Sequence, residues 1–175
     1  MSHVEKITGE LRALTTGVER AQGLAAAAHK QAQELALRAA GSGFAAVAAG
    51  MVRVQGAISE IQGGLGGLAA SIGEATKATA AVPHQATPQE TIAGLAPVRS
   101  AVDGVRDTTA KTIARIGEAQ QLATIVLQGG QPGPMLSGLA GIKQVLTLLV
   151  QRTGTARQAV EVAIVEARQL GSARD

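Results

Sequence analysis

The sequence lacks cysteine, tryptophan and tyrosine, and it has a single phenylalanine among its 175 residues. Without cysteine there is no disulfide framework, no thiol nucleophile and no cysteine-ligated zinc site. Without tyrosine and tryptophan, most of the aromatic platforms on which single-stranded nucleic acids stack are missing. Any hydrophobic core must therefore be built from alanine, valine, leucine and isoleucine.

Charge is also scarce and nearly balanced. Lysine and arginine number 16 and aspartate and glutamate 13, so the formal net charge is only +3. The basic residues are not clustered, and many have an acidic residue three or four positions away. We therefore predict ion pairs within single helices: Glu34 with Arg38, Asp103 with Arg106, Asp107 with Lys111, and Arg157 with Glu161. Binding to DNA or RNA is not expected.

The residues needed for metal or acid–base chemistry are not arranged for it. A di-iron site in a helical bundle needs two Glu-x-x-His motifs, yet none of His3, His29 and His84 has a glutamate three positions earlier. We interpret the three histidines as solvated surface residues. We expect no metal, no cofactor and no enzymatic activity; a cryptic enzyme would need a bound cofactor.

A glycine run at Gly63-Gly64-Leu65-Gly66-Gly67 superficially resembles a phosphate-binding loop. It lacks the Lys-Ser/Thr pair that follows such a loop, and Leu65 continues a helical spacing of apolar residues. The run therefore predicts a weak stretch of helix, which either frays or has another helix packed against its smooth face.

Four long series of apolar or small residues recur at alternating spacings of three and four, the pattern of a coiled-coil seam. They run from Val4 to Ala39, from Phe44 to Val82, from Ile92 to Val126 and from Met135 to Leu170. Short turns separate the first series from the second and the third from the fourth. The pattern predicts an all-α protein of four long helices in two antiparallel hairpins, a coiled-coil-like four-helix bundle. The hairpins would span residues 1–82 and 88–175, joined by a linker at 83–87.

Local signals mark the expected helix ends. Ser2 with Glu5 and Thr87 with Glu90 form capping boxes, and Pro88 and Pro134 suit the first turn of a helix. Gly41 and Gly129 are placed to end helices in the left-handed conformation. Pro97 should kink the third helix or delay its start.

The ends and apolar runs of the chain argue against a Sec signal peptide and a membrane span. Glu5 and Lys6 interrupt the N-terminal region where a signal peptide would be apolar. The longest charge-free stretch, residues 119–142, contains several glutamines and the sequence Gly-Gly-Gln-Pro-Gly-Pro, which predicts a turn. We expect a cytoplasmic protein and leave non-classical export open.

One end of the predicted bundle has no ionisable side chain, because the charges nearest its two turns are Arg38, Arg53, Glu118 and Lys143. Such an end could dock a partner, dimerise or touch a lipid surface; the alternative is an ordinary turn. The candidate partner-contact residues are Phe44, Val47, Met51, Leu127, Met135 and Leu136.

Three short motifs carry a resemblance. They are Thr-Pro-x-x-Thr-Ile at residues 87–92, Gly-Gly-Gln-Pro-Gly-Pro at 129–134 and Glu-Ala-Arg-Gln-Leu-Gly at 166–171. Together with the Ala/Gly/Val/Arg-rich composition, they resemble a family of small uncharacterised helical proteins of high-GC bacteria, a resemblance that implies no activity. Each hairpin is also similar in layout to the WXG-type proteins of type VII secretion and to leader domains of polymorphic toxins, although the first turn lacks tryptophan.

These observations favour a non-enzymatic helical interaction protein that self-associates or pairs with a helical partner through its seams. The resemblance implies a partner or chaperone associated with a secretion or toxin system. The alternative is an amphipathic coat protein, like the phasins of storage granules, whose hairpins open and lay their apolar stripes on lipid or polymer.

Overall fold

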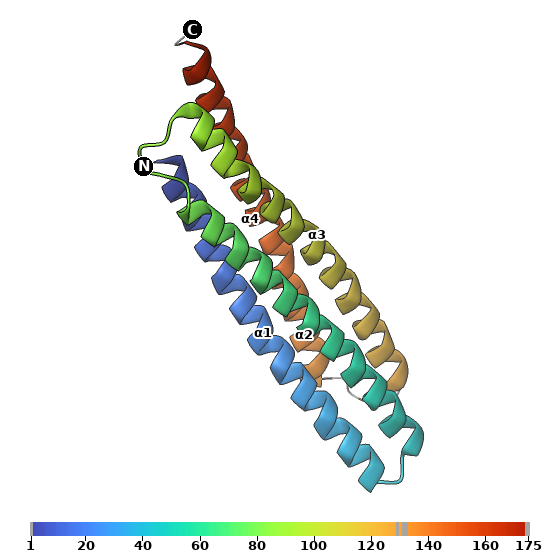
Figure 1. Cartoon of the computed structure of the whole chain (residues 1–175). Helices are drawn as coiled ribbons and strands as arrows, with labels where there is room; N and C mark the ends of the chain where they lie inside the picture. The colour runs from blue at the N-terminus through green and yellow to red at the C-terminus, as the bar shows by residue number, and fades with distance from the viewer. Residues whose placement is uncertain (1, 129, 131–132, 174–175) are drawn as a thin grey trace.

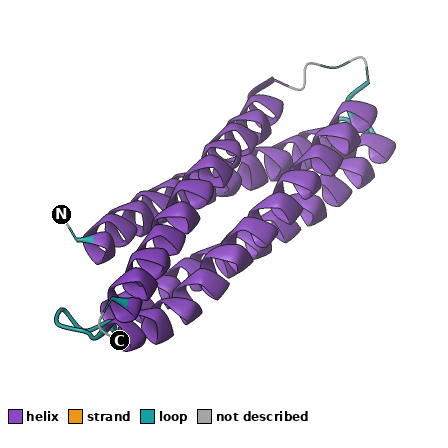
Figure 2. Cartoon of the chain, turned by 90° about the horizontal axis from the view of Figure 1, so that it is seen from above, coloured by secondary structure: helices purple, strands orange, loops and turns teal. Residues whose placement is uncertain are grey.

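The chain forms four long α-helices in the computed structural model, which describes residues 2–128, 130 and 133–173 (Figure 1). They are α1 (His3–Gly41), α2 (Ala45–Ala80), α3 (Pro88–Val126) and α4 (Gly133–Ser172). The described residues contain no strand, and Figure 2 shows helix along nearly the whole length of the molecule. The prediction of an all-α protein with four long helices is confirmed.

The helices form a bundle in which each one packs against two neighbours. α1 contacts α2 and α4, and α3 also contacts α2 and α4. The helices alternate in direction, so the α1–α2 and α2–α3 connections lie at opposite ends (Figure 1). The two hairpins therefore close onto each other as an up-down-up-down four-helix bundle.

The core follows the predicted seams closely. Ile7, Ile58, Val102 and Leu146 are among the seam residues that are completely buried, one on each helix. The predicted seam residues that are not buried lie mainly towards the ends of the helices. Phe44 is 63% exposed and Leu170 is 64% exposed, and Leu35 is only half-buried because Ala36 occupies the buried position. These exceptions arise where one hairpin has no neighbour at its own level.

Four threonines occupy buried seam positions. Thr79, Thr109, Thr112 and Thr153 each donate their hydroxyl to the backbone carbonyl four residues earlier, at 2.7–2.8 Å. Each hydroxyl is thus satisfied within its own helix, which removes most of the cost of burying it.

Both predicted capping boxes are present. The Ser2 and Thr87 side chains accept from the backbone N–H of Glu5 and Glu90, whose carboxylates reach back to the capping residues. α3 begins at Pro88, so Pro97 does not delay its start and lies exposed inside the helix. At that position water can replace the hydrogen bond that proline cannot donate.

The end of α1 differs from the prediction. Gly41 is still helical, and the left-handed residue is Gly43, with φ of 80°. Phe44 N–H donates to the Ala39 carbonyl at 2.8 Å, and Gly43 N–H donates to the Ala40 carbonyl at 3.2 Å. This is a Schellman motif, which satisfies two terminal carbonyls and so favours the later stop. The second predicted cap, Gly129, lies outside the described residues.

The hairpins are displaced along the bundle axis. His3, the first residue of α1, pairs with Glu166, and α4 continues six residues further to Ser172, a length of about 9 Å. At the other end Gly50 of α2 packs against Val126, the last residue of α3. The α1–α2 hairpin therefore protrudes at one end and the α3–α4 hairpin at the other (Figure 1).

Candidate interaction site

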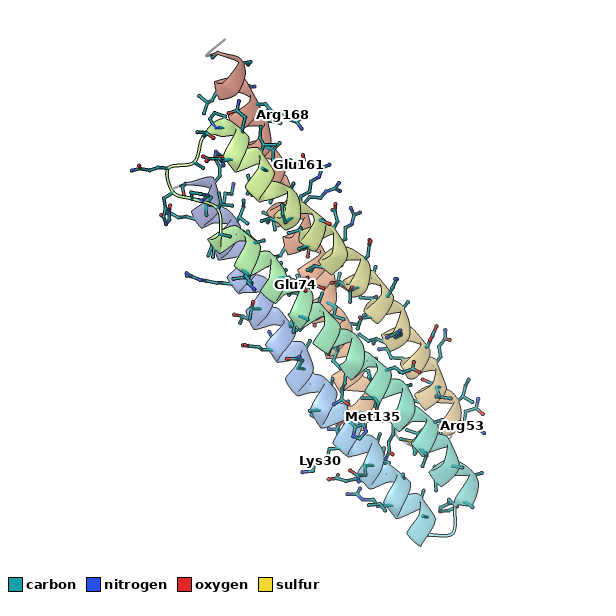
Figure 3. The ribbon with its side chains drawn as sticks, viewed as in Figure 1. Lys30, Arg53, Glu74, Met135, Glu161 and Arg168 are labelled. Atoms are coloured by element: carbon teal, nitrogen blue, oxygen red, sulfur yellow. The ribbon has the colours of Figure 1, made fainter. Side chains whose placement is uncertain are left out.

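The protruding end of the α1–α2 hairpin, residues 39–49, is called the tip below. Between Arg38 and Arg53 the chain has no ionisable side chain, and Figure 3 shows Arg53 pointing away from the bundle. Leu37 is 68% exposed and Phe44 63% exposed. The Schellman hydrogen bonds fix the backbone at Phe44, so the only aromatic ring of the protein is held at an uncharged, solvent-facing end.

The six residues predicted at this end have different environments. Met51 and Met135 are buried, with 0% and 1% exposure, so they belong to the core and are not accessible to a partner. Val47, Leu127 and Leu136 are half-buried and pack against the core, and Phe44 alone of the six is fully exposed. Seam residues face inward, which is why the two methionines cannot form part of the surface.

Sequence reasoning missed Leu37, an exposed residue beside Arg38 at the base of the tip. Its signal is visible in retrospect: it lies off the seam of α1, one residue before the last charge of that helix. The exposed apolar surface of the tip therefore comes from the α1–α2 hairpin, because α3 ends at the level of Gly50.

The charged side chains of the described residues pair between helices, so the four pairs predicted within helices, including Asp103–Arg106 and Arg157–Glu161, are wrong. Arg157 pairs with Asp103 at 3.1 Å and Arg99 with Glu161 at 2.8 Å, joining α3 to α4. Within the described chain, neither Glu34–Arg38 nor Asp107–Lys111 is among the salt bridges. Residues that flank a seam face the adjacent helix, which brings opposite charges from two helices together.

Two more pairs join α1 to α4, Arg152 with Glu10 at 3.5 Å and His3 with Glu166. His3 therefore pairs with a residue of a neighbouring helix, whereas the sequence predicted a solvated surface residue. All four pairs found among the described residues lie in the half of the bundle away from the tip. Glu161 and Arg168, labelled in Figure 3, mark that half.

A pocket of about 560 Å³ opens at the linker end, the end opposite the tip where residues 81–87 connect α2 to α3. Its apolar wall includes Val82, Leu95, Ala167 and Leu170. Its ionisable lining residues are His3, His84 and Glu166. No sequence pattern indicates this pocket, because the pocket depends on how far α3 and α4 extend past α1.

Other sites considered from the sequence have no supporting geometry. Among the described residues, no group of three or more His, Asp or Glu side chains is placed to hold a metal ion. The glycine run lies in an unbroken part of α2: Gly63, Gly66 and Gly67 have open space around them, whereas Gly64 abuts Thr112 of α3. The run is thus neither frayed nor covered by another helix of this chain on its outer side.

In length and composition, α4 is the one helix of the described chain that is apolar enough to cross a membrane. In the bundle its apolar seam, from Met135 to Ala167, faces the core. The charge-free stretch at 119–142 is divided between the end of α3 and the start of α4, as the predicted turn requires.

The structure thus defines an all-α, up-down-up-down four-helix bundle with an uncharged apolar tip and a pocket at the opposite end. Residues 86–172 match the model of a family described as "Family of unknown function (DUF6244)". The matched segment takes in the α3–α4 hairpin and contains all three motifs on which the resemblance noted above rests. A search of curated proteins finds no match to the chain.

Proposed function

We propose that this protein is a non-enzymatic helical interaction protein that binds a protein partner through its tip. The observation that carries the proposal is the uncharged, protruding end on which Phe44 is about two-thirds exposed, with Leu37 equally exposed beside Arg38 at its base. Exposed apolar side chains that cluster at a protruding, uncharged end are typical of interaction surfaces. The partner is a second copy of this chain or another helical protein; the hairpin resemblance suggests a protein of a secretion or toxin system.

The bundle also explains why the tip is a better candidate than the seams. Seam residues along all four helices are buried against one another within this chain. A partner that used them would first have to separate the hairpins and expose that core to water. The tip needs no such rearrangement.

The size of the effect at Phe44 follows from its exposure. Complete burial of a phenylalanine side chain contributes about 1.5–3 kcal/mol, and about two-thirds of this side chain is available for burial. A partner that covers the ring gains about 1–2 kcal/mol from it, so removing the ring should weaken binding about fivefold to thirtyfold. Glutamate at this position adds the cost of desolvating a charge and should weaken binding further.

The test compares two glutamate variants of equally accessible residues. Phe44→Glu changes the tip. Leu148→Glu is the matched control, because Leu148 is 55% exposed and lies near the middle of α4, far from either end of the bundle. Each variant and the wild type are used as bait in extracts of the native host, and bound proteins are quantified. We expect a protein retained by the wild type and by Leu148→Glu to be lost from Phe44→Glu. Equal binding to all three baits would refute the proposal.

A second candidate function is the phasin-like coat. One observation favours it: Leu148, Val162 and Val165 form exposed apolar positions along α4. Sedimentation with liposomes or polymer granules tests this candidate. A bundle that satisfies its own seams should stay in the supernatant and keep its helix packing, whereas a coat protein should sediment and open its hairpins.

A further inference from the structure

A different hairpin protrudes at each end of the bundle, because the two hairpins are displaced along the bundle axis. At the tip, α1 and α2 extend beyond α3, which ends beside Gly50. At the linker end, α3 and α4 extend beyond α1, whose first residue lies beside Glu166. Figure 1 shows both protrusions. Each protruding pair of helices has an inner face that continues the interface between the hairpins but lacks the other hairpin at that level. At the linker end, residues 82–87 cover part of this face, with Val82 packed against Gly94.

The protruding hairpin at one end of the bundle can pack beside the protruding hairpin at the other end of a second copy. When two copies are stacked end to end, the α1–α2 tip of one copy comes to lie beside the α3–α4 protrusion of the next. The packing of hairpin on hairpin, established inside each copy, then continues across the junction. The two protrusions are similar in length, because α2 begins five residues beyond Gly50 and α4 ends six residues beyond Glu166.

The pocket supplies a specific place for the tip to bind. It lies between the inner side of α3 and α4, the linker and the start of α1, and Leu95, Ala163 and Ala167 form part of its buried wall. Leu170, which is 64% exposed, stands at its edge. A volume of about 560 Å³ is ample for one aromatic side chain. The tip carries no ionisable side chain, so insertion buries no charge of its own, and Glu166 of the pocket already pairs with His3 of the receiving copy.

We propose that this protein associates head to tail, with Phe44 of one copy inserted into the linker-end pocket of a second copy. The inference rests on the proposed function, since it names the partner and the receiving site of the tip. Such a contact joins two different surfaces and does not close on itself, so copies add in a line as the concentration rises. The contact is small, and small interfaces give weak complexes. We therefore expect dissociation constants between about 1 μM and 1 mM.

The experiment is sedimentation velocity on the full chain at concentrations from about 10 μM to 1 mM, a range chosen for weak complexes. The wild type should rise in average mass with concentration. Phe44→Glu blocks the tip and Leu170→Glu blocks the pocket edge, and each variant alone should remain monomeric. Both residues are exposed, so the variants should fold, which circular dichroism checks. Leu148→Glu is the control and should associate like the wild type.

Mixing the two blocked variants gives the decisive result. Phe44→Glu keeps an intact pocket and Leu170→Glu keeps an intact tip, so an equimolar mixture should form one-to-one dimers and nothing longer. A twofold contact of tip with tip would instead leave Leu170→Glu able to associate alone, and that outcome overturns the proposal. A mixture that stays monomeric, or a wild type that is monomeric throughout, overturns it as well.

Salt provides a further check, because the tip carries no ionisable side chain between Arg38 and Arg53, and Glu166 of the pocket is paired with His3 of its own copy. Association of the wild type should change less than threefold between about 50 mM and 500 mM salt, a range over which charge attraction is strongly screened. A tenfold or larger loss in affinity would show that charged groups carry the contact. The bait experiment remains separate: a monomeric wild type whose Phe44→Glu variant loses a host protein refutes self-association and retains the proposed function.

Discussion

Replacing the three open glycines of α2 with alanine should stabilise the protein substantially. At Gly63, Gly66 and Gly67, an added methyl group would meet no atom within 4 Å. A glycine in an exposed helix costs about 0.8–1.0 kcal/mol relative to alanine. The triple variant should therefore gain about 3 kcal/mol in the free energy of unfolding. For a chain of this length, that gain raises the melting temperature by about 6–12 °C.

The neighbouring Gly64 provides the control. A methyl group there would lie 2.7 Å from Thr112 Oγ1. Thr112 is only 1% exposed, and its hydroxyl is committed to the Thr108 carbonyl at 2.8 Å. The side chain therefore cannot move away without losing packing or that bond. Overpacking costs about 1–3 kcal/mol, against about 1 kcal/mol gained in helix propensity, so Gly64→Ala should be neutral or destabilising by up to about 2 kcal/mol.

Thermal and urea unfolding followed by circular dichroism measure both variants, with the oligomeric state recorded at the same concentration. The reasoning is refuted if Gly64→Ala stabilises as much as a single open position does. It is also refuted if the triple variant melts below the wild type. A lower melting temperature accompanied by loss of an oligomer would show that the outer face of α2 is covered by another chain.

Three further predictions test packing and capping. Gly17→Ala should lower the melting temperature relative to Gly23→Ala, because a methyl group at Gly17 overlaps the side chain of Leu149 while the space at Gly23 is open. Thr87→Ala removes the side-chain cap of α3 and should cost about 1 kcal/mol, seen as a fall of about 2–4 °C in melting temperature. The hydrogen bond from the Thr87 backbone N–H, followed by that from the Thr87 hydroxyl, lowers the pKa of Glu90 below its usual 4.5. The stability that this shift contributes is present above about pH 4.5 and is lost as the pH falls through the pKa of the folded protein. Below about pH 4.5, the free energy of unfolding of Glu90→Gln, measured by urea titration, should therefore fall less steeply with decreasing pH than that of the wild type.

Much of the fold could be predicted because helix formation here is a local matter. Apolar residues at spacings of three and four predict both the helix and the face that it buries. Capping boxes fix two of the helix starts with hydrogen bonds between residues three apart. The stop at Gly43 was harder to place, because Gly41 and Gly43 are equally able to adopt a positive φ. The choice depends on which one lets the following N–H groups reach the last carbonyls.

The candidate site was predictable only in part. The absence of charge between Arg38 and Arg53 is a property of the sequence, and these residues form the α1–α2 turn and the ends of the two helices beside it. Which apolar side chains are accessible there was not predictable from spacing alone. Met51 and Met135 are buried, while Phe44 and Leu37 are exposed. The difference arises because α3 ends at the level of Gly50, so the turn between α1 and α2 extends beyond it. This relation between the two hairpins cannot be found from either hairpin alone.

The sequence by itself determined four helices, their buried faces and an uncharged end, because each depends on residues within a few turns of one another. Tertiary structure alone decided the axial displacement of the hairpins. That displacement depends on fits between helices, such as Val126 against the gap at Gly50 and Leu149 against the gap at Gly17. It also decided that Asp103 pairs with Arg157 across two helices and that a pocket opens beside Leu170. Periodicity defines which face of a helix is buried, but it leaves a helix free to slide along its neighbour until specific side chains interlock.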